Sequence, residues 1–78
     1  MAEVHLFAAA RAAVGSSVLV VDAGPLARIL DDVAVAHPAF ASVRPRCSFL
    51  VDGVAVHDED VEVGAADRVD VLPPFSGG

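Results

Sequence analysis

Apolar residues recur at every second position in two segments, residues 3–8 and residues 67–72. A period of two is typical of a β-strand with one buried face, so we expect a strand in each segment. Residues 18–21 form a short run of valine and leucine, which predicts a third strand. The residues expected on the buried face of the first and last strands are Val4, Leu6, Val69 and Val71.

Residues 25–37 carry the signals of a helix. Pro25 suits the first helical position, because the N–H that it lacks would be unpaired there anyway. Pro38 disfavours helical geometry at His37, so the helix is expected to stop near that residue. Apolar side chains at helical spacing then make one stripe of Leu26, Ile29, Leu30 and Val33.

The rest of the chain is predicted to hold a hairpin and irregular connections. Asp52-Gly53 separates the apolar runs 48–51 and 54–57 and suits a type I′ turn, whose two central residues need a positive φ. Residues 9–14 are predicted to form a loop or a short turn. Residues 40–46, which lie close to two prolines, are predicted to be irregular.

These elements predict an α+β domain over residues 1–72. The helix has one apolar stripe and the sheet has one apolar face, so the main helix is expected to pack on one face of a mixed sheet of about five strands. That is the layout of a β-grasp, ubiquitin-like domain. Residues 73–78 follow the last strand and are predicted to form a flexible C-terminal tail that ends in Gly-Gly.

The composition predicts a small folded domain with neither a nucleic-acid partner nor a membrane span. The chain has 78 residues, of which 55% are hydrophobic, so it can build a core but not a large enclosed cleft. An autonomous enzyme is therefore not expected. A net charge of −6 opposes binding to nucleic-acid phosphates. No apolar run approaches the ~20 residues that span a bilayer.

The cysteine and histidine content predicts a cytoplasmic protein without a metal site. Cys47 is the single cysteine, so no intrachain disulfide is possible and a reducing compartment is expected. Glu3 stands where a signal peptide carries positive charge. His5, His37 and His57 are scattered, which matches surface or edge positions better than the clustered ligands of zinc.

The last six residues carry the chemistry that the rest of the chain lacks. Pro73 and Pro74 enforce an extended exit from the last strand, and six residues reach up to about 20 Å. Gly77 and Gly78 have no side chains, so they can thread a narrow channel and present an unhindered carboxylate. Adenylation with ATP would activate that carboxylate toward sulfur or an amine. The alternative interpretation is a frayed end without a role.

Two motifs make the chain resemble a known family. Residues 10–15 read Ala-Arg-Ala-Ala-Val-Gly, and residues 67–78 read Asp-Arg-Val-Asp-Val-Leu-Pro-Pro-Phe-Ser-Gly-Gly. With the order of elements they resemble the MoaD/ThiS sulfur-carrier family over essentially the whole chain, and within it the small subunit of molybdopterin synthase. The turn before the last strand departs from the family, because Ala65-Ala66-Asp67 replaces Asp-Gly-Asp. Either an alanine at positive φ there costs about 1 kcal/mol, or the turn differs from that of the family.

The resemblance implies a sulfur carrier whose reactive atom lies at Gly78. An activating enzyme, an adenylyltransferase/sulfurtransferase, would use ATP to adenylate the Gly78 carboxylate and convert it to a thiocarboxylate. Gly77 would be the threading residue, and the chain itself would bind no cofactor. The tail would enter the active site of the molybdopterin synthase large subunit, in a heterotetramer, and deliver sulfur to a pterin precursor.

An apolar docking patch is expected beside the tail. Phe7 and Leu72 fall on the face opposite the buried side chains, and the first and last strands are neighbours in β-grasp domains. Exposed apolar and aromatic side chains of this kind mark partner sites. The alternative is that residues 9–14 shield them. The residues expected to bind a partner are Phe7, Leu72, Pro73, Pro74, Phe75 and Ser76.

The same C-terminus supports other functions. A carrier of this kind also serves thiamine, cysteine or natural-product biosynthesis, because the receiving partner selects the pathway. A ubiquitin-like modifier would instead join the activated Gly78 to lysines of target proteins. This chain has no lysine, so it cannot link to itself through side chains. A β-grasp binding module with an inert tail, and a sulfur relay through Cys47, are the further alternatives.

Overall fold

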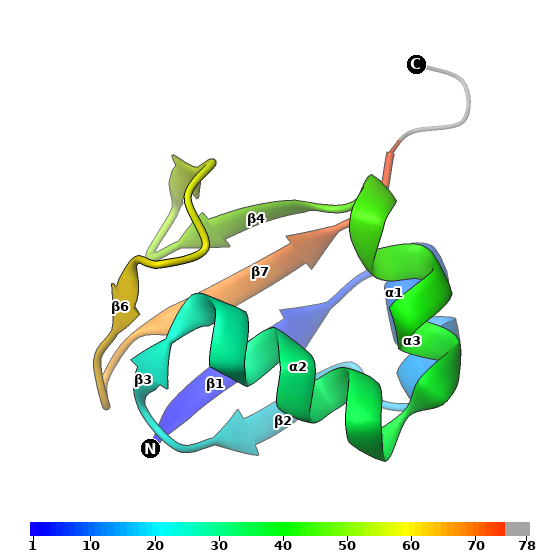
Figure 1. The fold of residues 1–78 in the computed structure, drawn as a ribbon, viewed down its shortest axis with the longest axis horizontal. Coiled ribbons are helices and arrows are strands. Elements are labelled where there is room, and N and C mark those ends of the chain that lie inside the picture. Colours follow the sequence, from blue (N-terminus) through cyan, green and yellow to red (C-terminus); the bar gives the residue numbers. More distant parts are fainter. Residues whose placement is uncertain (75–78) are drawn as a thin grey trace.

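The structure is a computed structural model that describes residues 1–74. The strands of its main sheet are β1 (Ala2–Leu6), β2 (Val18–Val21), β4 (Ser48–Val51), β5 (Val54–Val56) and β7 (Arg68–Leu72). They lie in the order β2-β1-β7-β4-β5 (Figure 1). β1 and β7 run parallel and the other three pairs are antiparallel, which confirms the predicted mixed sheet of five strands. A second, two-stranded sheet pairs β3 (Gly24–Pro25) with β6 (Glu62–Val63).

The predicted main helix is confirmed as α2 (Leu26–Ala36), which crosses one face of the main sheet (Figure 1). Its buried residues are the predicted stripe of Leu26, Ile29, Leu30 and Val33. The connection between β5 and β6 supplies its N-terminal cap. The first two helical N–H groups donate to the carbonyls of Val61 and Glu59, at 2.9 and 2.8 Å. No helix in residues 1–74 has the length and apolar character needed to cross a membrane.

The prediction of a loop over residues 9–14 is wrong, because helix α1 (Ala8–Val14) forms there. Alanine has the highest helix propensity, and five of these seven residues are alanine. Gly15 ends the helix at a φ of 84°, a value that glycine adopts at little cost, and its N–H donates to the Arg11 carbonyl. Ala10 and Val14 are buried, so tertiary packing also holds this short helix in place.

The prediction of an irregular segment over residues 40–46 is also wrong. Helix α3 (Pro38–Val43) and a 3₁₀ turn (Arg44–Arg46) occupy it, and α3 packs against α1. Pro38 occupies the first turn of α3, where a missing N–H breaks no hydrogen bond. The side chain of Phe40 is fully buried and is the largest of the buried set, so the core selects the helix despite the nearby prolines.

The first strand ends at Leu6, two residues earlier than the alternating pattern predicts. Phe7 keeps an extended backbone, with φ −124° and ψ 150°, and its N–H donates to the Val71 carbonyl at 3.3 Å. Ala8 then has a φ of 49°, in the left-handed region that disfavours residues with a Cβ. The chain therefore changes direction sharply beside the end of β7.

The core lies between the main sheet and the helices. Val4, Leu6, Val69 and Val71 are at most 1% exposed, so the predicted inward set of the first and last strands is confirmed. Residues paired across strands share a face of the sheet. The helix-covered face therefore includes Phe49, which pairs with Val71. No side-chain nitrogen or oxygen buried within residues 1–74 lacks a hydrogen-bond partner.

Two turns lie beside the start of the last strand. Asp52 and Gly53 have φ values of 50° and 81°, which confirms the predicted hairpin turn. Before β7, the Asp67 N–H donates to the Gly64 carbonyl at 3.0 Å, and the Gly64 N–H donates to Asp67 Oδ2 at 2.7 Å. Ala65 and Ala66 are not at positive φ in this turn, so the expected cost of alanine there does not arise.

Candidate functional site

The tail leaves the domain from the middle of the main sheet. β7 is paired on both sides, with β1 and β4, and its last residue, Leu72, lies opposite Ser48 (Figure 1). Pro73 is half-buried and Pro74 is exposed. Neither has an N–H, so neither can donate to a continued ladder. We call Leu72 and Pro73 the tail base. The predicted roles of Phe75, Ser76, Gly77 and Gly78 concern residues outside the described part of the chain.

Phe7 and Leu72 lie next to one another at the tail base. Leu6 and Val71 are register partners and are buried under the helices, so the residues that follow them face the other way. The Phe7 side chain is 39% exposed and Leu72 is partly exposed. The alternative in which residues 9–14 shield Phe7 does not match this exposure. The structure therefore brings together Phe7 and Leu72, the two residues of the described chain for which the sequence analysis predicts a docking role.

The same face of the main sheet carries two further exposed valines. Val18 and Val20 of β2 lie opposite His5 and Glu3 of β1, and they are 40% and 62% exposed. We call this side of the sheet, opposite the helices, the open face. Sequence analysis placed residues 18–21 in a strand but did not assign their faces. All four residues are apolar, so the run has no alternation from which their faces could be assigned.

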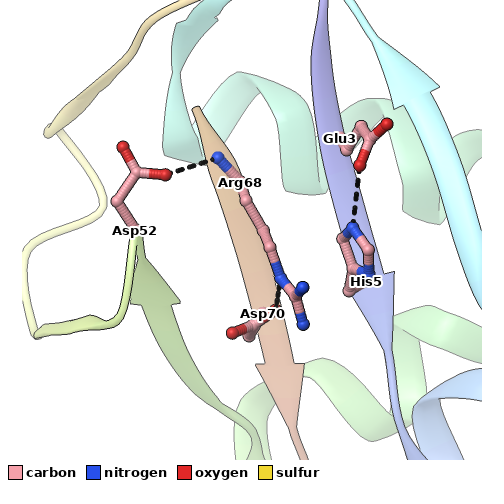
Figure 2. A network of polar contacts seen from close by, with 5 residues as sticks. All are labelled: Glu3, His5, Asp52, Arg68 and Asp70. Atoms are coloured by element: carbon pink, nitrogen blue, oxygen red, sulfur yellow. Dashed lines mark hydrogen bonds and ion pairs between the residues drawn. The ribbon is translucent and has the colours of Figure 1, made fainter. Parts of the chain in front are cut away.

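A square of charges occupies the centre of the open face. Glu3 lies opposite Arg68, and His5 lies opposite Asp70, on the parallel strands β1 and β7. Within each strand, His5 Nε2 is 2.9 Å from Glu3 Oε1, and Arg68 Nε donates to Asp70 Oδ1 at 2.6 Å (Figure 2). Acidic side chains thus adjoin Arg68 or His5 along and across the strands, and the pairs with His5 are ionic only when its imidazole is protonated. Such pairs contribute roughly 0.2–1 kcal/mol each.

Asp52 joins the hairpin turn to the first residue of β7. Asp52 Oδ1 accepts a hydrogen bond from the Arg68 N–H at 2.8 Å (Figure 2), and the Asp52 N–H donates to the Arg68 carbonyl at 2.8 Å. The turn therefore satisfies both backbone groups of Arg68. The strand that leads to the tail base is held at its start by Asp52 and along its length by two neighbouring strands.

Cys47 lies beside the tail base, and its thiol is expected to be a weak nucleophile. It directly precedes Ser48, the register partner of Leu72. Its Sγ–H donates to the Val43 carbonyl at 3.4 Å, and burial raises the pKa of the thiol. A pocket of about 280 Å³ adjoins it, lined by Cys47, Ser48, Phe49, Ala55, Val56, His57 and Glu59. Because the thiolate is the reactive form, a raised pKa disfavours the sulfur-relay interpretation of Cys47.

The histidines do not converge on a site. His5 pairs with Glu3 on the open face, His37 ends α2, and His57 follows β5. Within residues 1–74, no three His, Cys, Asp or Glu side chains gather in a way that could hold a metal ion.

Arg44 is the side chain that ties the connection after β5 to the helices. Burial opposes its charge, but hydrogen bonds to Asp31 and Glu59, at 2.5 and 2.8 Å, raise the pKa of Arg44 above its ordinary value. Arg44 therefore holds α2, the 3₁₀ turn and the connection together on the helix side, away from the open face.

The fold and the position of the tail define a class of small ubiquitin-like β-grasp proteins. The family model described as ThiS matches residues 4–78, which is almost the entire chain and includes the Gly-Gly end. The chain therefore belongs to the ThiS family.

Two similar proteins bear on function, and a third shares the fold. A molybdopterin synthase sulfur carrier subunit from Chlamydomonas reinhardtii is 37% identical over 51 residues, which cover 64% of this chain and 61% of that protein. The crystal structure of SAMP1 from Haloferax volcanii superposes with a TM-score of 0.84 at 28% identity, over 99% of this chain and 98% of that one. A chain from the structure of the complex of subunits 1 and 2 of the molybdopterin-converting factor from Helicobacter pylori superposes with a TM-score of 0.75, over 99% of this chain and 97% of that one. The identity is 16%, so this match shows the fold alone.

Proposed function

We propose that this chain is a sulfur carrier whose C-terminal Gly78 is activated and loaded with sulfur, most directly for molybdopterin synthesis. The observation that carries the proposal is the ThiS family match, which runs through the β-grasp domain to the last glycine. The Chlamydomonas relative, a molybdopterin synthase sulfur carrier subunit, supports the choice of pathway.

The proposed chemistry has two steps, which begin from the Gly78 carboxylate. First, a carboxylate oxygen attacks the α-phosphate of ATP on the activating enzyme, and pyrophosphate leaves. Hydrosulfide then attacks the carbonyl carbon of the acyl adenylate, a C–S bond forms, AMP leaves with the electrons of the broken C–O bond, and the S–H proton passes to water. The product is a thiocarboxylate. The chain contributes the carboxylate and its access, while the partner enzymes supply the catalytic groups.

The geometry of the tail base suits this role. β7 is hydrogen-bonded on both sides and anchored at its start by Asp52, so the tail begins from a fixed point. From Pro73 to Gly78 the covalent chain spans at most about 20 Å. A partner can therefore receive the carboxylate in an active site set back from its surface while the domain stays docked outside.

The proposed docking site is the exposed Phe7 with the partly exposed Leu72, continued by Pro73, Pro74, Phe75 and Ser76. The proposed partners are the activating enzyme, an adenylyltransferase/sulfurtransferase, and the large subunit of molybdopterin synthase, in a heterotetramer. The Chlamydomonas relative is named as a subunit of molybdopterin synthase, which supports a partner subunit. An aromatic side chain beside the tail would act as the anchor of such an interface.

The second candidate function is protein modification. A solved relative from Methanosarcina acetivorans, with a TM-score of 0.84 and 26% identity, is described as small archaeal modifier protein 1. A modifier would use the same acyl adenylate but would transfer Gly78 to an amine of another protein. Thiamine, cysteine and natural-product pathways remain alternatives within the sulfur-carrier function.

Reconstitution with the activating enzyme tests the proposal. The full chain, the enzyme and labelled pyrophosphate are expected to give chain-dependent exchange of label into ATP. Addition of a sulfide source is then expected to replace one oxygen by sulfur in the intact mass. A chain without Gly78 is the matched control, because its domain is unchanged. Exchange that is equal with the truncated chain would contradict activation at Gly78.

A further inference from the structure

We propose that the outer edge of β2 is a self-association surface, on which a second copy of this chain pairs its own β2 in antiparallel orientation. β2 is the outermost strand of the main sheet on its side, and β1 is its neighbour in the sheet. In Figure 1 no other helix or strand of residues 1–74 runs along its outer side. The proposal goes beyond the sulfur-carrier function and does not rest on it, because it concerns the sheet edge and not the tail.

The hydrogen bonds of β1 show which backbone groups of β2 point outward. In an antiparallel pair, residues that exchange hydrogen bonds alternate with residues that do not. The Glu3 N–H donates to the Asp67 carbonyl, at the start of β7, and the Leu6 N–H donates to the Ser17 carbonyl, just before β2. The odd-numbered residues of β1 therefore bond to β7, and the even-numbered residues bond to β2.

Val18 and Val20 carry the outward groups. They lie opposite His5 and Glu3, whose backbone groups point to β7, so neither valine exchanges hydrogen bonds with β1. The N–H and C=O of each valine point to the outer edge, and no turn or loop within residues 1–74 bonds to them. The two side chains are also 40% and 62% exposed on the open face. At these two residues both the backbone and the side chain are uncovered.

β2 has none of the features that keep sheet edges from pairing. Natural edge strands are protected by charged residues, by proline or by a bulge. β2 reads Val-Leu-Val-Val, and it pairs with β1 in unbroken register along its whole length. A strand of this kind is a template for another strand of the same sequence.

The opposite edge of the sheet, β5, is less suited to self-pairing. The Asp52 N–H donates to the Arg68 carbonyl, so the even-numbered residues of β4 bond to β7 and the odd-numbered ones bond to β5. Ala55 lies opposite Leu50 and is therefore the one residue of β5 whose N–H and C=O point outward. An acidic run over residues 58–60 follows β5 closely. Two such edges would bring like charges together, which favours β2 as the edge that receives a second copy.

One register satisfies the outward groups of both copies. With Leu19 of each copy on a two-fold axis, Val18 of one copy lies opposite Val20 of the other, and each such pair exchanges two hydrogen bonds. Residues paired across strands share a face, so four valines form one apolar patch on the open face. β2 has no charged residue, so no charges meet across the seam. A shift of the register by two residues would place Val18 opposite Asp22 instead.

Pairing through β2 leaves both tail bases accessible. In the sheet order β2-β1-β7, the last strand is separated from β2 by one strand, which places it about 10 Å from the seam. The two-fold axis puts the two copies of β7 on opposite sides of the seam, running in opposite directions. The pair therefore presents two tails, and Phe7 and Leu72 of each copy stay uncovered.

The pair is expected to be weak. The seam is only as long as β2, far shorter than a standard interface of about 1,600 Å² requires. We therefore expect a Kd on the order of 1 mM. The net charge of −6 on each copy adds a repulsion that salt screens.

The test is amide hydrogen exchange of the full, nitrogen-15-labelled chain, followed by NMR. Rates are compared at about 0.05 mM and about 2 mM protein, concentrations that bracket the expected Kd, in ~0.5 M NaCl to screen the repulsion. Mass action predicts that the Val18 and Val20 amides exchange about twofold more slowly at the higher concentration. The Ala55 amide, which points outward at the other edge, is the internal control and is expected to keep its rate.

Two lysine variants separate edge pairing from general association. Val20→Lys places a charge on the seam, whereas Val35→Lys makes the same change of net charge on α2, where Val35 is 82% exposed. Each variant is compared with itself at the two concentrations. Val35→Lys is expected to keep the twofold slowing at Val18, and Val20→Lys is expected to lose it, because an edge lysine opposes pairing. Wild-type rates that do not depend on concentration would overturn the proposal, and so would equal slowing at Ala55 or in both lysine variants.

Discussion

Asp52 offers a quantitative test of how β7 is held. The substitution Asp52→Ala removes two contributions: the hydrogen bond from the Arg68 N–H at 2.8 Å, and the tolerance of an aspartate for the left-handed φ of 50°. An exposed hydrogen bond of this kind contributes about 1 kcal/mol. Placing alanine at such a φ adds roughly 0.5–1 kcal/mol. We therefore expect the free energy of unfolding to fall by about 1.5 kcal/mol.

Two further variants at the same position separate the contributions. Asp52→Gly loses the hydrogen bond but accepts the positive φ, so it should cost about 1 kcal/mol. Asp52→Asn keeps both the acceptor oxygen and the tolerance for that φ, so it should cost under ~0.5 kcal/mol. Thermal unfolding followed by circular dichroism is the assay, and Asp52→Ala should lower the midpoint by about 6–12 °C. A loss for asparagine as large as that for alanine would refute the argument, because the geometry of the turn would then not be the cause.

Three other predictions follow from particular positions. Ala8→Gly relieves the φ of 49° and should raise the midpoint of thermal unfolding by about 2–4 °C; a lower midpoint would contradict the strain. Phe7→Ala should weaken binding to the molybdopterin synthase large subunit about 30-fold, measured by calorimetry. Val20 is also exposed but lies away from the tail base, so Val20→Ala should change this affinity less than about threefold. Equal losses of affinity would place the interface elsewhere. Burial raises the pKa of the Cys47 thiol, so alkylation by iodoacetamide at pH 8 should be slower in the folded chain than in urea, and equal rates would contradict the burial. The free energy of unfolding should decrease as the pH rises above about 8.5, because the thiol of the unfolded chain then ionises first.

Sequence periodicity predicted the parts of the fold in which a whole face is apolar. The stripe that begins at Leu26 and the alternation around Val69 each reflect burial against a second layer, so both the elements and their inward residues were correct. The hairpin was correct because Asp52-Gly53 suits only a few turns.

The two short helices were missed for different physical reasons. α1 has seven residues, so it is too short for a period of 3.6 to stand out, and its stability comes from packing against α3. α3 begins at Pro38, which was interpreted as a helix breaker, although proline fits the first turn of a helix. In both cases the deciding interaction is a tertiary contact, through Val14 and Phe40, that local sequence does not contain.

The candidate site was predictable only in part. The neighbourhood of Phe7 and Leu72 follows from the parallel pairing of the first and last strands, which the resemblance to β-grasp domains implied. The exposure of Val18 and Val20, and the charge square of Glu3, His5, Arg68 and Asp70, depend on the register between strands. Register is a property of the assembled sheet, so the pattern within one strand does not specify it.

The most direct test of the sulfur-carrier function is the intact mass of the full chain purified from its own cells under sulfur-replete, non-reducing conditions. The account predicts a fraction of the chain in which one oxygen is exchanged for one sulfur, and the loss of that fraction when Gly78 is removed. A chain that keeps its unmodified mass, even after incubation with the activating enzyme, ATP and sulfide, would contradict the central claim.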